Sequence, residues 1–333
     1  MLRYVIGIVS GFTGAGVIWV GLFLASFGIL DTHGDRTVTA WYQIKQEVAG
    51  TKSGAKKIVF VGGSNVLYGI SAAEVEQAFG MPCLNFGTHA GLPFDYLLHR
   101  VKQVVSPGDI LVISLEWEYL HRPLDDLNSV YTGCILGGDP RYFWRLPASQ
   151  QLRICFSAPV SRLVLPLTIS PEASAGVQNV YMDSVRGVHI DSWGDFMGNF
   201  PERRAKSELA RLLGLTPHPC TLAEAEGHSD FWKVVRELRN WAKRKRVTVV
   251  FAAPALLDNP ILTGADYRQI FAAGEKHYES LGIPVIARQN TNFYGESLMF
   301  DSVYHLNSAG REIRTKQLIE GLKPVVSRGS TPK

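Results

Sequence analysis

The stretch Lys57–Asn65, KIVFVGGSN, decides the fold of this chain. Its apolar part, Ile58–Val61, has the length and β-branched composition of a buried strand. Two glycines then form a tight turn, and the capping-box pattern of Ser71–Glu74 indicates that a helix begins soon after it. Ser64 is therefore expected at the carboxyl end of a strand, where nearby backbone N–H groups can meet an oxyanion.

Strand and helix patterns alternate along the chain. Further strands are expected at Pro82–Phe86, Asp109–Leu115, Val247–Ala253 and Ile283–Ala287, with helices at Ala72–Phe79, Phe94–Val105, Asp230–Arg244, Asp266–Leu281 and Ser308–Val325. This alternation predicts an α/β fold with a parallel sheet of about five strands and helices on both faces. Ligands bind at the carboxyl ends of such strands. The residues at these ends are Ser64, Gly87, Glu116, Ala253 and Pro254.

A second candidate group lies near the end of the chain. Asp301 and His305 precede the last predicted helix. With Ser64 they have the residue types of a Ser-His-Asp hydrolase or acyltransferase site, in which an acid orients an imidazole that activates a hydroxyl. Each residue also has a structural alternative: Ser64 could cap a helix, His305 could bind backbone, and Asp301 could cap a turn.

The N-terminus carries a long apolar segment. Tyr4–Leu30 contains no charged residue and is longer than the ~20 apolar residues that span a bilayer. A cleavable signal peptide is the alternative, but its apolar core would be only about 7–15 residues long. We therefore expect residues 1–30 to be an uncleaved transmembrane signal anchor and residues 31–56 to be a partly helical stalk. Arg3 before the span weakly favours a cytoplasmic N-terminus and an exported body.

Composition excludes several classes of protein. With 333 residues and a net charge of +4, the chain gives no sign of nucleic-acid binding, and its basic cluster Lys243–Arg246 suits the end of a helix. The four cysteines lack metal-ligand spacing, so we expect no metal and no cofactor. Cys134 and Cys155 could pair in an exported body, and the sequence leaves this open. We place one domain at residues 57–326 and a flexible tail at residues 327–333.

A long insertion, at about residues 120–228, separates the third and fourth predicted strands. It is rich in proline, glycine and aromatic residues, and connections of this length usually serve as lids or binding surfaces. Within it, Trp193, Asp195 and Asn199 combine a flat ring with groups that can bind sugar hydroxyls. The alternative is a structured loop that its own Asp and Asn side chains cap.

The serine turn, the alternating strands and helices, and the acid–histidine segment together resemble the SGNH (GDSL-like) hydrolase superfamily. The resemblance covers roughly residues 57–120 and 245–325. The first block of that family is a Gly-x-Ser-x turn that carries the nucleophile, as at Gly62–Asn65. Its second block gives a glycine N–H to the oxyanion hole, which points to Gly87. Its last block is Asp-x-x-His followed by asparagine and glycine, and Asp301–Gly310 is similar with one extra residue between the acid and the histidine.

The resemblance implies a three-layer α/β/α, flavodoxin-like fold and an acyl-enzyme mechanism. Ser64 would be the nucleophile, His305 the general base, and Asp301 the residue that orients the imidazole. The N–H groups of Ser64 and Gly87, helped by the side chain of Asn65, would form the oxyanion hole. Resolution of the acyl-enzyme by water would make the protein an esterase, and resolution by a sugar hydroxyl would make it an acyltransferase.

The chain also departs from the family pattern. The third block usually carries an asparagine that donates to the oxyanion, whereas here the third strand runs into Glu116 and Glu118. An anionic Glu116 cannot stabilise an oxyanion, so we expect it to be protonated, turned away or in another role. His89, Glu116 and Glu118 could contact a substrate, or the two glutamates could act as an acid/base pair. The alternatives are that the glutamates contact backbone N–H groups or arginine side chains and that His89 is an incidental loop histidine. The residue three before His305 is Ser302 rather than an acid.

A Glu-x-Glu-Tyr strand ending, an anchor and a large insertion resemble the membrane-anchored branch of the superfamily, which acts in O-acetylation of alginate and bacterial cellulose and in D-alanylation of teichoic acids. This resemblance implies a single-pass protein of the bacterial inner membrane, with a periplasmic domain that acts on O-acetyl groups of a cell-envelope or secreted polysaccharide. It also implies a membrane-bound O-acyltransferase as partner. The alternatives are a catalytically degenerate binding or scaffold protein and an esterase of small or lipid esters.

Overall fold

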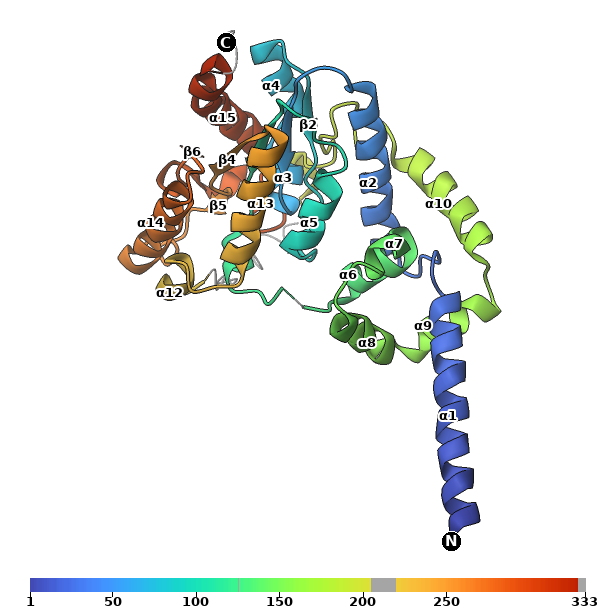
Figure 1. Ribbon diagram of the computed structural model, residues 1–333. Coiled ribbons are helices and arrows are strands. Elements are labelled where there is room, and N and C mark those ends of the chain that lie inside the picture. The colour runs from blue at the N-terminus through green and yellow to red at the C-terminus, as the bar shows by residue number, and fades with distance from the viewer. Residues whose placement is uncertain (125, 205–219, 329–333) are drawn as a thin grey trace. The chain divides into compact units, whose positions relative to one another are not determined.

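The computed structural model describes residues 1–124, 126–204 and 220–328. Parts of the expected insertion at 120–228 and of the expected tail at 327–333 lie outside these residues. The chain divides into two compact units (Figure 1). Unit 1 comprises Met1–Ala40 and Leu127–Ser184, and unit 2 comprises Trp41–Asp126 and Val185–Lys333.

Unit 1 contains the apolar N-terminal helix, α1 (Leu2–Ala25). Within the described residues, α1 is the one helix that is long and apolar enough to cross a membrane, and it is almost wholly exposed. The other helical segments of unit 1 are α6 (Ser129–Gly133), the π-helical turn η2 (Cys134–Gly138), α7 (Pro140–Phe143), α8 (Ala148–Ser157), α9 (Val160–Val164), η3 (Leu165–Leu167) and α10 (Pro171–Val185).

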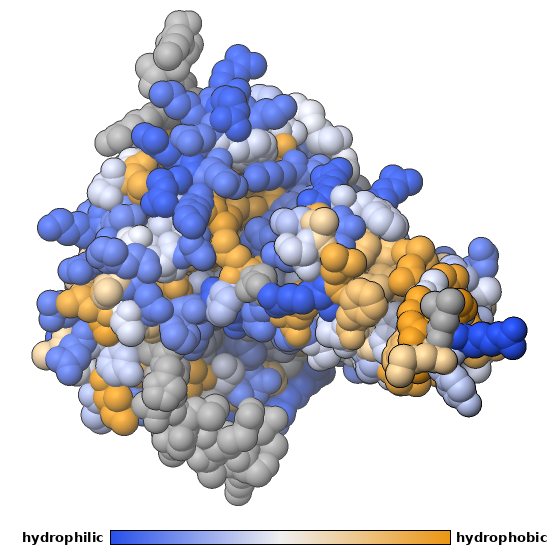
Figure 2. Space-filling model, turned by 60° about the horizontal axis from the view of Figure 1, so that its bottom comes forward, coloured by the Kyte–Doolittle hydropathy of each residue, from blue (hydrophilic) through white to orange (hydrophobic). Residues whose placement is uncertain are grey.

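Much of the expected insertion thus folds together with the N-terminal helix. Short helices of four to ten residues, such as α7 and α8, give too little periodicity for a sequence pattern to reveal. In Figure 2, hydrophobic residues gather on the right of the view, over α1 and the neighbouring part of unit 1. The expected stalk at 31–56 consists mainly of helix α2 (His33–Thr51), which has residues in both units. The described cysteines form no disulfide, so the structure does not link Cys134 to Cys155.

Unit 2 is an α/β unit, as the sequence predicts. Its five strands are all parallel and lie in the spatial order β2-β1-β3-β4-β6. Most of their residues are buried, which is why they read as continuous apolar runs. The strands are β1 (Ile58–Val61), β2 (Cys83–Asn85), β3 (Ile110–Ile113), β4 (Thr248–Ala252) and β6 (Val285–Ala287), beside a short pair of β5 (Leu256–Leu257) and β7 (Phe293–Tyr294).

The helices of unit 2 follow the predicted alternation with two additions, α3 (Ser64–Gly69) and α12 (Leu222–Ala225). The turn after β1 opens a short helix at once, α3 (Ser64–Gly69), and the predicted helix follows as α4 (Ala72–Phe79). Ser71 caps α4, because its hydroxyl accepts the N–H of Glu74. The others are α5 (Phe94–Val101), α12 (Leu222–Ala225), α13 (Phe231–Lys245), α14 (Ala265–Ser280), α15 (Ser308–Arg328) and the short 3-10 turns η1 (Trp117–Leu120), η4 (Pro201–Arg203), η5 (Gln289–Thr291) and η6 (Glu296–Leu298).

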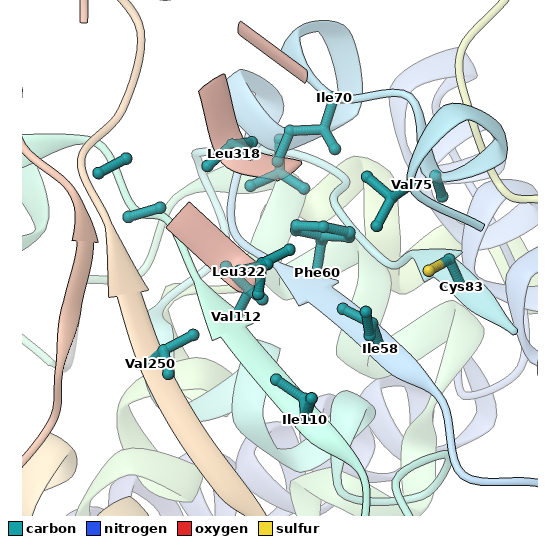
Figure 3. Packing of buried hydrophobic residues seen from close by; sticks show 14 residues of the cluster. Ile58, Phe60, Ile70, Val75, Cys83, Ile110, Val112, Val250, Leu318 and Leu322 are labelled. Atoms are coloured by element: carbon teal, nitrogen blue, oxygen red, sulfur yellow. The ribbon is translucent and has the colours of Figure 1, made fainter. Parts of the chain in front are cut away.

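Helices α4 and α15 cover one face of the sheet. Figure 3 shows Phe60 of β1 and Val112 of β3 among the side chains of this face. They belong to one fully buried cluster with Leu318 and Leu322 of α15. Burying a side chain of this size contributes roughly 1.5–3 kcal/mol, so this face is a main source of stability.

The other face is covered by α5, α13 and α14, largely through aromatic rings. Phe251 of β4 stacks on Tyr278 of α14 with ring centroids 4.0 Å apart. Phe94 of α5 stacks on Phe231 of α13 with centroids 5.1 Å apart. Helices on both faces leave the carboxyl ends of the strands as the open edge, where the candidate site lies.

Candidate functional site

The serine turn is built from two glycines that have no room for a side chain. A Cβ atom at Gly62 would overlap the carbonyl oxygen of Ser114, and one at Gly63 would lie 2.5 Å from Glu116 Oε2. The turn therefore passes directly against the end of β3. It delivers Ser64, which is half-buried, to the first position of α3 at the carboxyl end of β1.

The structure pairs the predicted acid with the predicted histidine. Asp301 Oδ1 lies 2.6 Å from His305 Nδ1, and the two side chains are 29% and 17% exposed. The loop bends through Ser302, whose carbonyl accepts the N–H of His305, so the extra residue does not prevent the contact. An acid on Nδ1 leaves Nε2 to accept a proton, which is the arrangement that a general base needs.

The imidazole lies against the helix that Ser64 begins. The His305 ring stacks on Tyr68 of α3, with centroids 4.3 Å apart and planes 6° apart. Asn199 ties the same two segments together, because its side-chain amide donates to the carbonyls of Tyr68 (3.0 Å) and Leu306 (2.9 Å). The structure therefore brings the serine helix and the acid–histidine loop to one place in unit 2.

Glu116 occupies the position next to the serine. Its Oε1 accepts the backbone N–H of Asn65 at 2.8 Å and the hydroxyl of Ser64 at 3.4 Å. The side chain is almost fully buried, and Oε2 has no hydrogen-bond partner among the described residues. The glutamate is thus not turned away: its carboxylate lies where an oxyanion on Ser64 would need donors.

Two of the three predicted oxyanion donors already donate hydrogen bonds within the fold. Asn65 is fully buried, and its side-chain amide donates to the carbonyl of Ser114 at 3.1 Å. The N–H of Gly87 donates to the side chain of Asn85 at 3.0 Å. The N–H of Ser64, at the first position of α3, meets no acceptor within the described part of the chain.

Arg314 is a site residue that the sequence reasoning missed. Its guanidinium is fully buried and donates to the carbonyls of Asn65 (2.9 Å) and Ala253 (3.1 Å) and to the hydroxyl of Ser114 (2.8 Å). It therefore holds together residues that follow β1, β3 and β4. Burial lowers the pKa of Arg314 to about 10, so it stays charged at neutral pH. The sequence did contain a clue to its burial. Arg314 lies four residues before the core residue Leu318 on α15, so both side chains lie on the same face of the helix.

Glu118 and His89 lie in the same region. Burial raises the pKa of Glu118 to about 7, while the neighbouring hydroxyl of Tyr304 acts to lower it. His89 Nδ1 accepts the N–H of Gly91 at 2.9 Å, so the other ring nitrogen carries the proton of the neutral form. Burial lowers the pKa of His89, while the nearby charge of Glu116 acts to raise it and that of His305 to lower it further.

Glu118→Gln is expected to flatten the pH dependence of unfolding. The folded chain holds a proton on Glu118 up to about pH 7, whereas an exposed glutamate releases it near 4.5. Below pH 4.5 both states of the chain hold this proton, so Glu118 does not destabilise the fold. As the pH rises to about 7, only the unfolded chain releases the proton, and the free energy of unfolding falls by at most ~1.4 kcal/mol per pH unit. Urea titrations of both full-length proteins in detergent measure it. Parallel curves for the two proteins would contradict the prediction.

The three candidate sugar-binding residues of the insertion have structural roles, which corrects that expectation. Asp195 is buried and accepts the N–H groups of Ala72 (2.8 Å) and Ala73 (3.1 Å), so it caps α4. Trp193 packs its ring against the core cluster, and its carbonyl accepts the N–H of Asn85. Asn199 is the amide that ties α3 to the histidine loop, and it is also buried.

Three groups that nucleophilic chemistry uses lie in this part of unit 2, although the described hydrogen bond of the Ser64 hydroxyl goes to Glu116 rather than to His305. They are a half-exposed hydroxyl, an imidazole oriented by a carboxylate, and one N–H group without a described acceptor. Within the described residues, no group of three or more His, Cys, Asp or Glu side chains is placed to hold a metal ion. In comparisons with known proteins, no family model and no curated protein matches this chain.

Proposed function

We propose that the protein is a serine acyltransferase or esterase of the SGNH type. The observation that carries this proposal is the Asp301–His305 pair, stacked on Tyr68 of the helix that Ser64 begins. The strand order β2-β1-β3-β4-β6, with helices on both faces, is that of flavodoxin-like three-layer folds, and it supports the resemblance to this superfamily.

The proposed substrate is an acyl ester, for instance an O-acetyl group, on a cell-envelope or secreted polysaccharide. The proposed location is the bacterial cytoplasmic membrane, with α1 as the anchor and unit 2 on the periplasmic side. Support comes from α1, a helix long and apolar enough to span a bilayer, and from the family resemblance. A membrane-bound O-acyltransferase that supplies the acyl group is the proposed partner.

The reaction starts with attack of the Ser64 hydroxyl on the acyl carbon, while its proton moves to His305 Nε2. Asp301 holds Nδ1–H of the imidazole and stabilises the imidazolium that forms. The tetrahedral intermediate then expels the alkoxide, which takes the proton from His305, and acyl-Ser64 remains. Water or a sugar hydroxyl attacks this ester by the same sequence and gives a free acid or a new ester, with Ser64 restored.

Glu116 has a defined part in this proposal. The oxyanion meets the N–H of Ser64, but a carboxylate beside it would repel the developing charge. Substrate binding therefore has to displace Glu116 from Asn65, which frees the Asn65 N–H as a second donor. One such donor typically raises the rate by about 10²–10³-fold. The free energy needed to displace Glu116 is subtracted from this gain and therefore limits the rate.

The position of Glu116 also favours a second candidate function. A carboxylate that bonds Ser64 and Asn65 suits a protein that no longer performs acyl transfer. Such a protein would bind the polysaccharide or hold the membrane-bound acyltransferase.

Labelling with a fluorophosphonate probe separates the two functions. The full-length enzyme is expected to take the label on Ser64, and His305→Ala is expected to slow labelling by at least about 10³-fold because the base is lost. The matched control is His121→Ala, since His121 also pairs with a carboxylate, that of Glu224, at 2.8 Å but is 66% exposed. A folded protein that no phosphonate labels at Ser64 would support the binding function instead.

A further inference from the structure

Unit 1 exposes a set of large apolar side chains on the helices that pack against the end of α1. Leu152 and Phe156 are four residues apart on α8, and Val160 and Val164 are four apart on α9, so each pair shares one helix face. Soluble surfaces rarely gather this much apolar area without a partner. We call the following residues, which are 43% to 71% exposed, the apolar platform: Trp144, Leu152, Phe156, Val160, Val164 and Leu167.

The charge of the same segment has one sign. Residues 140–168 contain four arginines and no aspartate or glutamate, and three of the arginines, Arg141, Arg145 and Arg153, are exposed. Arg162 is buried, and Asp31 and Asp35 act on its charge. Exposed Trp, Phe and Leu side chains combined with arginine are typical of segments that lie in the interface of a bilayer. Arginines at this level also attract anionic lipid headgroups.

Three contacts fix where the apolar platform lies along α1. The indole N–H of Trp19 donates to the carbonyl of Cys155 in α8 at 2.9 Å. The guanidinium of Arg162 in α9 donates to the carbonyl of Ser26, the residue that ends α1, at 3.2 Å. The ring of Phe27 lies 6.0 Å from that of Trp144. The segments that carry the platform therefore contact the last turns of α1 and the residues just after it, rather than its N-terminal half.

The length of α1 relates this position to a bilayer. Its apolar stretch has 23 residues, which is about 35 Å of helix, against a hydrocarbon core of ~30 Å. The end that carries Trp19 and Ser26 thus lies where the helix leaves the hydrocarbon. Lipid that surrounds α1 must also reach the segments bonded to this end.

We propose that the apolar platform is a second membrane-contact surface, which rests in the headgroup region beside α1, and that the exposed arginines of the same segment draw anionic phospholipid to it. The proposal depends on α1 as a membrane span but on no acyl chemistry. A protein partner is the competing occupant. The bilayer is favoured because it is already present at the end of α1 and because the charge of the segment is wholly positive.

Nitroxide spin labels on the full chain test the proposal. Leu167→Cys lies on the platform, and Val180→Cys on α10 is its matched control, because the two native side chains are 71% and 72% exposed. Helix α10 bonds instead to residues beyond α1, through Ser174 to Leu30 and through Tyr181 to Thr37. Labelling uses a Cys220→Ala background, since the other three cysteines are buried.

In phosphatidylglycerol nanodiscs, the Leu167 label is expected to collide severalfold less with a water-soluble nickel chelate and more with oxygen than the Val180 label. Phe156→Cys gives a second platform label if Leu167→Cys fails to fold. Equal nickel exposure at platform and control would overturn the proposal and point to a protein partner, since these nanodiscs contain lipid alone. Equal protection in phosphatidylcholine nanodiscs would overturn the role of the arginines. Neither readout involves Ser64, so failure here is distinct from failure of the proposed function.

Discussion

Ser64→Ala is expected to abolish the proposed acyl-ester turnover, with a loss of at least about 10⁴-fold in kcat. The reason is that the proposed reaction forms its covalent intermediate on the Ser64 hydroxyl. The fold should survive, because the Ser64 hydroxyl makes one hydrogen bond within the described part of the chain, at 3.4 Å to Glu116. Turnover of a chromogenic acetyl ester, together with the thermal unfolding midpoint, measures both effects.

Ser302→Ala is the matched control for this variant. The Ser302 hydroxyl also makes one hydrogen bond at 3.4 Å, to the N–H of Tyr304, and it lies in the histidine loop. We expect its activity to stay close to that of the unmodified protein, since Asp301 rather than Ser302 contacts the imidazole. A Ser64→Ala protein that retained full turnover would show that another residue is the nucleophile.

Arg314→Met is expected to have the largest effect on stability. It would leave buried acceptors at Asn65, Ser114 and Ala253 without their donor, at a cost of about 3–5 kcal/mol in the free energy of unfolding. The serine turn would lose its support, so fluorophosphonate labelling of Ser64 should fall as well. Urea titration and labelling of the same preparation measure the two effects.

Lys316→Met, on the same helix, is the control for Arg314→Met. Lys316 is 67% exposed and pairs with Glu312 on the surface of α15. Its loss is expected to leave both the unfolding free energy and the labelling almost unchanged, because exposed ion pairs contribute little. Similar destabilisation by both replacements would mean that α15 is sensitive to any change, and that the buried guanidinium has no special role.

The sheet of unit 2 could be predicted because its strands are short apolar runs that end at turn residues. Each of the five predicted strands has its counterpart in the structure. Unit 1 could not be predicted in the same way. Its helices α6, α7 and α9 have only four or five residues. Contacts with α1, far away in the sequence, help to hold α7 and α9 in place. Local pattern carries little information about such segments.

The residues of the candidate site also differ in how far local sequence could predict them. Ser64, Asp301 and His305 lie in short local motifs, and the sequence pointed to all three. The roles of Glu116, Asp195 and Asn199 depend on partners 51 to 131 residues away, which no local pattern specifies. A polar residue in the insertion looks the same whether it faces a sugar or caps a helix, and only burial in the folded chain distinguishes the two.

The bond between Arg314 and Asn65 has a consequence for biosynthesis. These residues are 249 positions apart, and a ribosome adds about 5–20 residues per second, so the arginine is made roughly 12–50 s after the asparagine. Throughout that interval the serine turn of the nascent chain lacks the hydrogen bonds that Arg314 donates. The serine turn therefore gains this support only after α15 has been made, and under the proposed function prematurely terminated products that lack α15 should be inert towards esters.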